Sequence, residues 1–90
     1  MAVLLVTYDA DENGQDYKGL VAMLKRYKHL FLIEGSWAIE TQEATRTVYN
    51  KVTKFLSQRV HVYVLTLTKP FTSQRLEDVT IWLGDHLPQT

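Results

Sequence analysis

The feature that most constrains the fold of this chain is the order of strand-like and helix-like stretches along only 90 residues. Apolar residues at helical spacing predict three helices, which follow the first, third and fourth of four predicted strands. The short turn Glu34-Gly35 separates the second and third strands. Short runs of apolar, β-branched and aromatic residues predict these strands at Val3–Tyr8, His29–Ile33, Ser36–Glu40 and Val60–Leu67.

This order, β-α-β-β-α-β-α, predicts an α+β domain. Because strand–helix–strand crossovers are right-handed, two of them on one antiparallel sheet give a ferredoxin-like βαββαβ plait with an appended C-terminal helix. We expect residues 1–90 to form a single domain, since chains divide into several domains only well above this length. A hydrophobic fraction of 46% suits a packed core and argues against intrinsic disorder.

The helix boundaries are predicted from capping residues and charges. Asp16 is the predicted N-cap of the first helix and Thr41 that of the second, with Glu43 in the first turn of the second helix. The basic residues predicted for the last turn of the first helix are Lys25, Arg26 and Lys28.

The third helix is predicted after Pro70. Thr80 and Ile81 are weak helix formers, so an additional strand at this place is the alternative. The cap of the predicted helix is Thr72 or Ser73, and its apolar face holds Leu76, Val79, Leu83 and Leu87, extended by Trp82.

Composition excludes several classes of function. The chain has no cysteine, so disulfides, thiolate catalysis and cysteine-ligated zinc are excluded. Ten acidic residues balance ten basic ones, which argues against strong, indiscriminate binding of nucleic acid by a monomer. No segment approaches the ~20 apolar residues of a membrane span, and the first residues lack the basic region of a signal peptide. We therefore expect a cytoplasmic protein with no membrane association.

An acidic loop follows the first predicted strand, which ends at Tyr8-Asp9. Residues 9–14 match the first half of a calcium-binding loop, but Leu20 occupies the position of the bidentate glutamate that completes such a loop. A solvated turn with a helix cap is therefore the preferred interpretation of the remaining acidic residues, which are Asp11, Glu12 and Asp16.

Asp9 differs from these residues because it follows a buried strand directly. It is the candidate metal ligand, and magnesium is the candidate ion because it prefers carboxylate oxygens. One carboxylate cannot satisfy magnesium alone, so we expect the site to form where a two-fold dimer brings two Asp9 side chains together. In a monomer, Asp9 would be a turn residue.

Ser36-Trp37 is a second candidate binding site. Ser36 at a sheet end can orient a ligand or a water molecule, although an isolated serine on a strand is more often structural. His61 and Tyr63 share one face of their predicted strand, but the three histidines of the chain lack metal-ligand spacing. The signature of RNA-recognition modules is also absent, because the first strand has no mid-strand aromatic residue.

Taken together, the chain resembles the CRISPR-associated endoribonuclease family, the small second Cas protein of spacer acquisition. It resembles more closely the SinR-like group related to that family. The matching pieces are scattered over nearly the whole chain: Val6-Thr7-Tyr8-Asp9, Gly14-Gln15-Asp16-Tyr17, Ser36-Trp37-Ala38-Ile39 with Thr41, and Trp82-Leu83 followed by His86-Leu87.

The resemblance implies a homodimer built through the sheets and a magnesium-dependent endonuclease that acts on RNA or DNA. In this family the aspartate that ends the first strand is the proposed metal ligand and catalytic residue, and it falls on Asp9. For this chain we expect Tyr8, Ser36 and Trp37 to be the binding residues. The chain departs from the family in lacking a basic cluster near Asp9. The alternative implied by other relatives is a non-catalytic dimeric adaptor or inhibitor that binds a protein or nucleic-acid partner.

Overall fold

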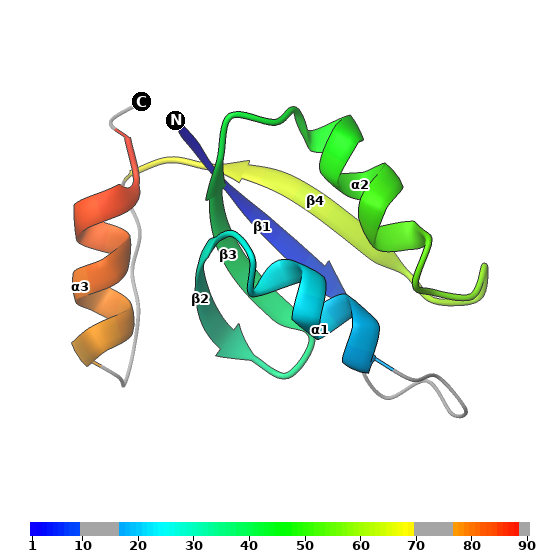
Figure 1. The fold of residues 1–90 in the computed structure, drawn as a ribbon. Helices are drawn as coiled ribbons and strands as arrows, with labels where there is room; N and C mark the ends of the chain where they lie inside the picture. The colour runs from blue at the N-terminus through cyan, green and yellow to red at the C-terminus, as the bar shows by residue number, and fades with distance from the viewer. Residues whose placement is uncertain (10–16, 70–76, 89–90) are drawn as a thin grey trace.

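The computed structural model describes residues 1–9, 17–69 and 77–88 of the chain (Figure 1). The predictions for Asp11, Glu12, Asp16, Thr72 and Ser73 lie outside these residues. The elements are β1 (Ala2–Tyr8), α1 (Lys18–Leu24), β2 (Lys28–Ile33), β3 (Ser36–Thr41), α2 (Thr45–Thr53), β4 (Val62–Leu67) and α3 (Glu77–His86).

The four strands form one antiparallel sheet in the order β2-β3-β1-β4. β1 is a central strand, with β3 on one side and β4 on the other. Over the described residues, the predicted α+β architecture of four strands and three helices is confirmed. The arrangement is compatible with a ferredoxin-like plait, with α3 as the additional helix. No helix within the described ranges is long and apolar enough to cross a membrane.

Two hydrophobic clusters cover opposite faces of the sheet, because neighbouring residues of a strand point to opposite sides. On the first face, Leu4 and Val6 of β1 pack against α1 and α2. On the second face, Val3 of β1 and Ala38 of β3 pack against α3. Figure 1 shows α2 beside β4 and α3 beside β2, on the two flanks of the sheet. The buried residues that α1, α2 and α3 bring to these clusters are Leu20, Leu24, Val48 and Val52 on the first face and Leu83 on the second, where Leu87, the residue after α3, joins it.

The turn between β2 and β3 confirms the prediction for Glu34-Gly35. Gly35 has a φ of 84°, a left-handed conformation that glycine adopts without steric cost. Its carbonyl oxygen accepts a hydrogen bond from the Tyr8 backbone N–H at 2.8 Å. The turn is thereby tied to the end of β1.

The predicted N-cap at Thr41 is wrong. Thr41 is the last residue of β3 and pairs with Ala2 of β1, while α2 begins at Thr45 after Ala44. Pairing with the central strand extends β3 through Thr41, and its hydroxyl then accepts a hydrogen bond from the Glu43 N–H at 3.0 Å. Glu43 therefore lies in a loop and not in the first turn of the helix.

Two other boundaries also differ from the prediction. The first helix ends at Leu24, so Lys25 and Arg26 lie in the following turn and Lys28 begins β2. The helical hydrogen bonding tightens after Lys25, because the N–H groups of Arg26 and Tyr27 donate to the Met23 and Leu24 carbonyls, only three residues earlier. The fourth strand begins at Val62, and Val60 precedes it in a turn.

The alternative of an additional strand near Thr80 and Ile81 is also wrong, since both residues belong to α3. Packing of Leu83 and Leu87 on the second face of the sheet outweighs the weak helix propensity of these two residues. The helix face predicted from Val79, Leu83 and Leu87 is the one that contacts the sheet.

Candidate functional site

Asp9 lies directly beyond the end of the central strand and is exposed to solvent. Its backbone N–H donates to the His61 carbonyl oxygen at 3.2 Å. Its own carbonyl oxygen accepts from the Tyr17 hydroxyl at 2.5 Å. The Asp9 backbone is thus held on one side by the residue before β4 and on the other by the residue before α1. The metal-binding and catalytic roles of Asp9 stay predictions.

Tyr8 and Trp37, two of the candidate binding residues, meet inside the first hydrophobic cluster. The Trp37 indole N–H donates to the Tyr8 hydroxyl at 3.3 Å, and both side chains are buried. The Tyr8 ring also stacks on Tyr17, with 5.2 Å between ring centroids. These contacts hold the end of β1 in place on its buried side. Tyr8 and Trp37 therefore support the position of Asp9.

The environment of Tyr8 keeps its hydroxyl protonated. Burial raises the pKa of Tyr8 and outweighs the lowering by the Trp37 hydrogen bond, and the nearby charge of Glu34 adds a smaller rise. A phenol with a raised pKa is a poor nucleophile or base at neutral pH. Tyr8 therefore acts in this arrangement as a hydrogen-bond acceptor for Trp37.

Ser36, the fourth candidate, lies on the other face of the sheet from Trp37. Its hydroxyl oxygen is 2.8 Å from that of Thr7, its partner in the ladder between β3 and β1. On the other side of Thr7, Tyr63 of β4 occupies the paired position. The structure thus brings Tyr8 and Trp37 together and places Ser36 in a separate row, Ser36–Thr7–Tyr63, across three strands.

The carboxylate of Asp9 is a suitable type of ligand for magnesium, but one carboxylate provides too few ligand atoms. Its carboxylate is a hard oxygen donor, the type that magnesium prefers. Within the described part of the chain, no three side chains of His, Cys, Asp or Glu gather as they would around a metal. A magnesium site that uses Asp9 therefore needs ligands from elsewhere, such as the Asp9 of a second copy.

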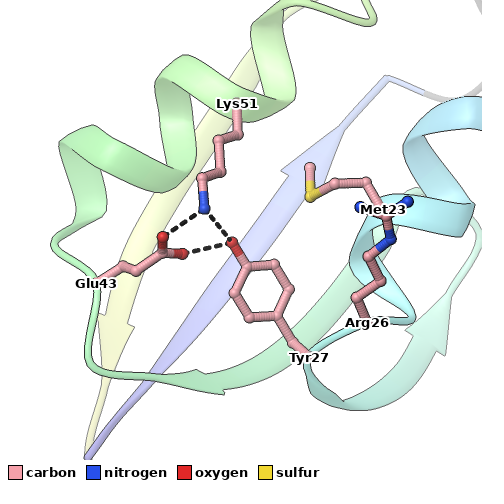
Figure 2. A pocket seen from close by; sticks show the side chains of 5 residues that line it. All are labelled: Met23, Arg26, Tyr27, Glu43 and Lys51. Carbon is pink, nitrogen blue, oxygen red and sulfur yellow. Dashed lines mark hydrogen bonds and ion pairs between the residues drawn. The ribbon is translucent and has the colours of Figure 1, made fainter.

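A second polar cluster joins the turn after α1, the loop after β3 and helix α2 (Figure 2). The Tyr27 hydroxyl donates to Glu43 Oε1 at 2.5 Å, and Lys51 forms an ion pair with Glu43 Oε2. Lys51 Nζ also lies 3.5 Å from the Tyr27 hydroxyl. With Met23 and Arg26, these three residues line a pocket of about 330 Å³.

The charges in this cluster stabilise one another. The hydrogen bond from Lys51, followed by that from Tyr27, lowers the pKa of Glu43. The hydrogen bond to Glu43 raises the pKa of Lys51. Burial raises the pKa of Tyr27, and its hydrogen bond to Glu43 acts in the same direction. At neutral pH the cluster is an ion pair bridged by a protonated tyrosine, an arrangement that stabilises the fold.

Local sequence patterns do not identify Tyr27 and Lys51 as partners of Glu43. Tyr27 is 16 residues from Glu43, and Lys51 is 8 residues from it, across a loop. The contacts exist because β3 extends to Thr41 and carries Glu43 into that loop.

No family model matches this chain, and searches among curated proteins and solved structures found no similar protein. The resemblance to CRISPR-associated endoribonucleases and to the SinR-like group stays a prediction.

Proposed function

We propose that this chain is a homodimeric, nuclease-like enzyme with a ferredoxin-like plait, in which two Asp9 carboxylates share one magnesium ion and act on the phosphodiester bonds of RNA or DNA. The observation that supports the proposal is the position of Asp9. It is an exposed carboxylate whose backbone is held by hydrogen bonds on both sides, at the end of the central strand. We place this activity in the cytoplasm.

Rigid placement matters because catalysis of this kind depends on groups held in position before the substrate arrives. The stacked pair of Tyr8 and Tyr17 and the hydrogen bond from Trp37 prevent the end of β1 from shifting. Magnesium, when bound, polarises a phosphate oxygen and makes a water molecule a better nucleophile. Asp9 from each subunit would hold the ion and leave positions for water and substrate.

Replacement of Asp9 tests this proposal. Asp9→Asn removes the negative charge and keeps the size of the side chain, so we expect cleavage of labelled RNA and DNA in magnesium to fall to the level seen in EDTA. Asp85→Asn, an exposed aspartate on α3, is the matched control and should keep wild-type cleavage. Full activity of Asp9→Asn, with its thermal unfolding unchanged, would show that the proposed site is wrong.

The dimer is tested separately by light scattering at micromolar concentration. We expect twice the mass of a single chain, because one Asp9 cannot hold magnesium by itself. A strictly monomeric protein would contradict the shared metal site even if some cleavage were observed.

A second candidate function is a non-catalytic dimeric adaptor that binds a protein partner. It is favoured by Phe31 and Ile33 of the outer strand β2, whose side chains are 47% and 66% exposed. Exposed apolar side chains on an outer strand are suited to contacts with another chain. This candidate predicts that Ile33→Lys weakens self-association or partner binding, and that no divalent metal produces cleavage by the wild-type protein.

A further inference from the structure

The pocket of about 330 Å³ beside the polar cluster lies at the opposite end of β1 from Asp9. Glu43, one of its lining residues, comes shortly after Thr41, which pairs with Ala2 at the start of β1. Asp9 follows the last residue of that strand, and the seven residues between the two places span about 20 Å. A dimer that joins two Asp9 side chains does not have to cover this pocket.

The polar wall of the pocket is held in place by hydrogen bonds. His29 Nδ1 donates to the Tyr27 carbonyl oxygen at 3.0 Å, and the Glu43 N–H donates to the Thr41 hydroxyl at 3.0 Å. The Tyr27 hydroxyl then joins the two segments through its hydrogen bond to Glu43. Because these groups are already in position, a ligand loses little free energy in ordering them.

The charges around the pocket do not balance. Its lining residues carry two positive charges, on Arg26 and Lys51, and one negative charge, on Glu43. The Glu43 carboxylate already accepts hydrogen bonds from Lys51 and Tyr27. The Arg26 side chain is exposed and forms no ion pair within residues 1–9, 17–69 and 77–88. The pocket therefore has an excess of one positive charge, which complements a ligand with one negative charge.

The free hydrogen-bonding groups of these two cations are all donors. The Lys51 ammonium has three N–H groups, of which two serve Glu43 and Tyr27. The Arg26 guanidinium has five N–H groups in a planar fork that matches the two oxygens of a carboxylate. Arg26 can therefore bind a carboxylate through two parallel hydrogen bonds, and Lys51 adds a further donor and positive charge.

The remaining wall of the pocket is apolar. Figure 2 shows the side chain of Met23 reaching from α1 toward Tyr27 and Lys51. A methionine side chain is unbranched and adapts to ligands of irregular shape, and the ring of Tyr27 adds a flat apolar surface. A volume of about 330 Å³ is at the lower end of the range for small-molecule sites. The ligand that fits is therefore a small molecule with a short apolar body.

We infer that this pocket binds a small monocarboxylic acid, with its carboxylate at Arg26 and its apolar part against Met23 and the ring of Tyr27. Glu43 acts against ligands with two negative charges, such as phosphate monoesters, because it repels them. This binding does not involve Asp9 and goes beyond the proposed function.

Methyl NMR tests this binding directly. The protein is labelled with ¹³C in the methyl groups of methionine, and the signal of Met23 is identified as the one missing from Met23→Leu. Addition of 4-methylpentanoate should shift this signal and saturate in the millimolar range expected for so small a ligand. The uncharged 4-methylpentanamide has the same shape and should bind about tenfold more weakly.

Three variants assign the binding to individual charges. Arg26→Gln should weaken the binding of 4-methylpentanoate by about tenfold. Arg59→Gln, which changes an exposed arginine outside this pocket, is the matched control and should bind like the wild type. Glu43→Gln removes the repelling charge and frees Lys51, so it should strengthen binding by about threefold, a gain that loss of structure cannot produce.

An unshifted Met23 signal, equal affinity for the amide, or wild-type affinity of Arg26→Gln would each overturn the inference. Tighter binding of leucine, which adds an ammonium group to the same acid, or of inorganic phosphate would also overturn it, because the pocket would then not select a single negative charge. Failure of the proposed nuclease function is distinguishable, since it concerns cleavage by Asp9→Asn, a variant that should bind 4-methylpentanoate like the wild type.

Discussion

The two faces of the sheet differ in how completely they are covered. The first face packs against two helices, and its central residues, Leu4 and Val6, are buried almost completely. The second face has one helix at one flank and leaves Tyr63 and Leu65 half exposed. Both faces are built from the same four strands, so the difference comes from the helices. The first face therefore contains more of the buried core than the second.

The largest expected effect is that of a leucine removed from the covered face. Leu4→Ala should lower the free energy of unfolding by about 2–5 kcal/mol, because it leaves a cavity in a fully buried cluster. Leu65→Ala is the same chemical change on the open face and should cost less than about 1 kcal/mol. Urea unfolding followed by circular dichroism measures both. Equal losses would show that the second face is also covered in solution.

An intermediate effect is expected for the tyrosine under Asp9. Tyr8→Phe leaves the buried Trp37 indole N–H without its acceptor, so we expect a loss of about 1–3 kcal/mol. Tyr63→Phe, the same change on the open face, should stay within about 0.5 kcal/mol of the wild type. The comparison uses the same unfolding measurement. If both variants were equally stable, the Trp37–Tyr8 hydrogen bond would have no energetic importance.

The smallest effect is expected at the cluster of Tyr27, Glu43 and Lys51, because the side chains of Glu43 and Lys51 are 29% and 43% exposed and their ion pair is screened by solvent. The pKa of Glu43 is lowered in the folded state, so its contribution is present above the ordinary value of 4.5 and is lost as the pH falls below it. Glu43→Gln should therefore lower the melting temperature slightly at neutral pH and leave it unchanged in acid.

Melting curves of wild type and Glu43→Gln across this pH range give the measurement, with Asp85→Asn as the control. The raised pKa of Lys51 adds a second limit at high pH, where the contribution of the pair is lost as Lys51 deprotonates. A difference between wild type and Glu43→Gln that did not change with pH would contradict the assignment of the effect to this ion pair.

Much of the fold could be predicted from local patterns. Strand positions follow from short apolar runs, and the turn at Gly35 follows from the need for a left-handed residue. The wrong predictions concern residues whose secondary structure or burial is determined by contacts with residues far away in the sequence. Thr41 has the chemistry of a helix cap, but pairing with Ala2 keeps it in β3. Ala38 stands between Ser36 and Glu40 on an otherwise polar strand face, and only the position of α3 explains why it is fully buried.

The candidate site could be predicted only in part. The place of Asp9 beyond the first strand follows from the sequence, since an apolar run ends there. The neighbours of Asp9 do not follow, because they depend on the register between β1 and β4. That register puts Asp9 beside His61 and Thr7 beside Tyr63, although each pair is far apart along the chain.

The central position of β1 has a consequence for how the chain is made. β1 leaves the ribosome before the other three strands, yet one of its two partners, β4, ends only at Leu67, which pairs with Val3. Until then, one side of the apolar run from Val3 to Val6 has no neighbouring strand. Sheets whose strands pair over long sequence separations form slowly, and their apolar segments are exposed until the pairing is complete. The time between the synthesis of β1 and that of Leu67 is therefore the interval in which nascent copies are most prone to associate with one another.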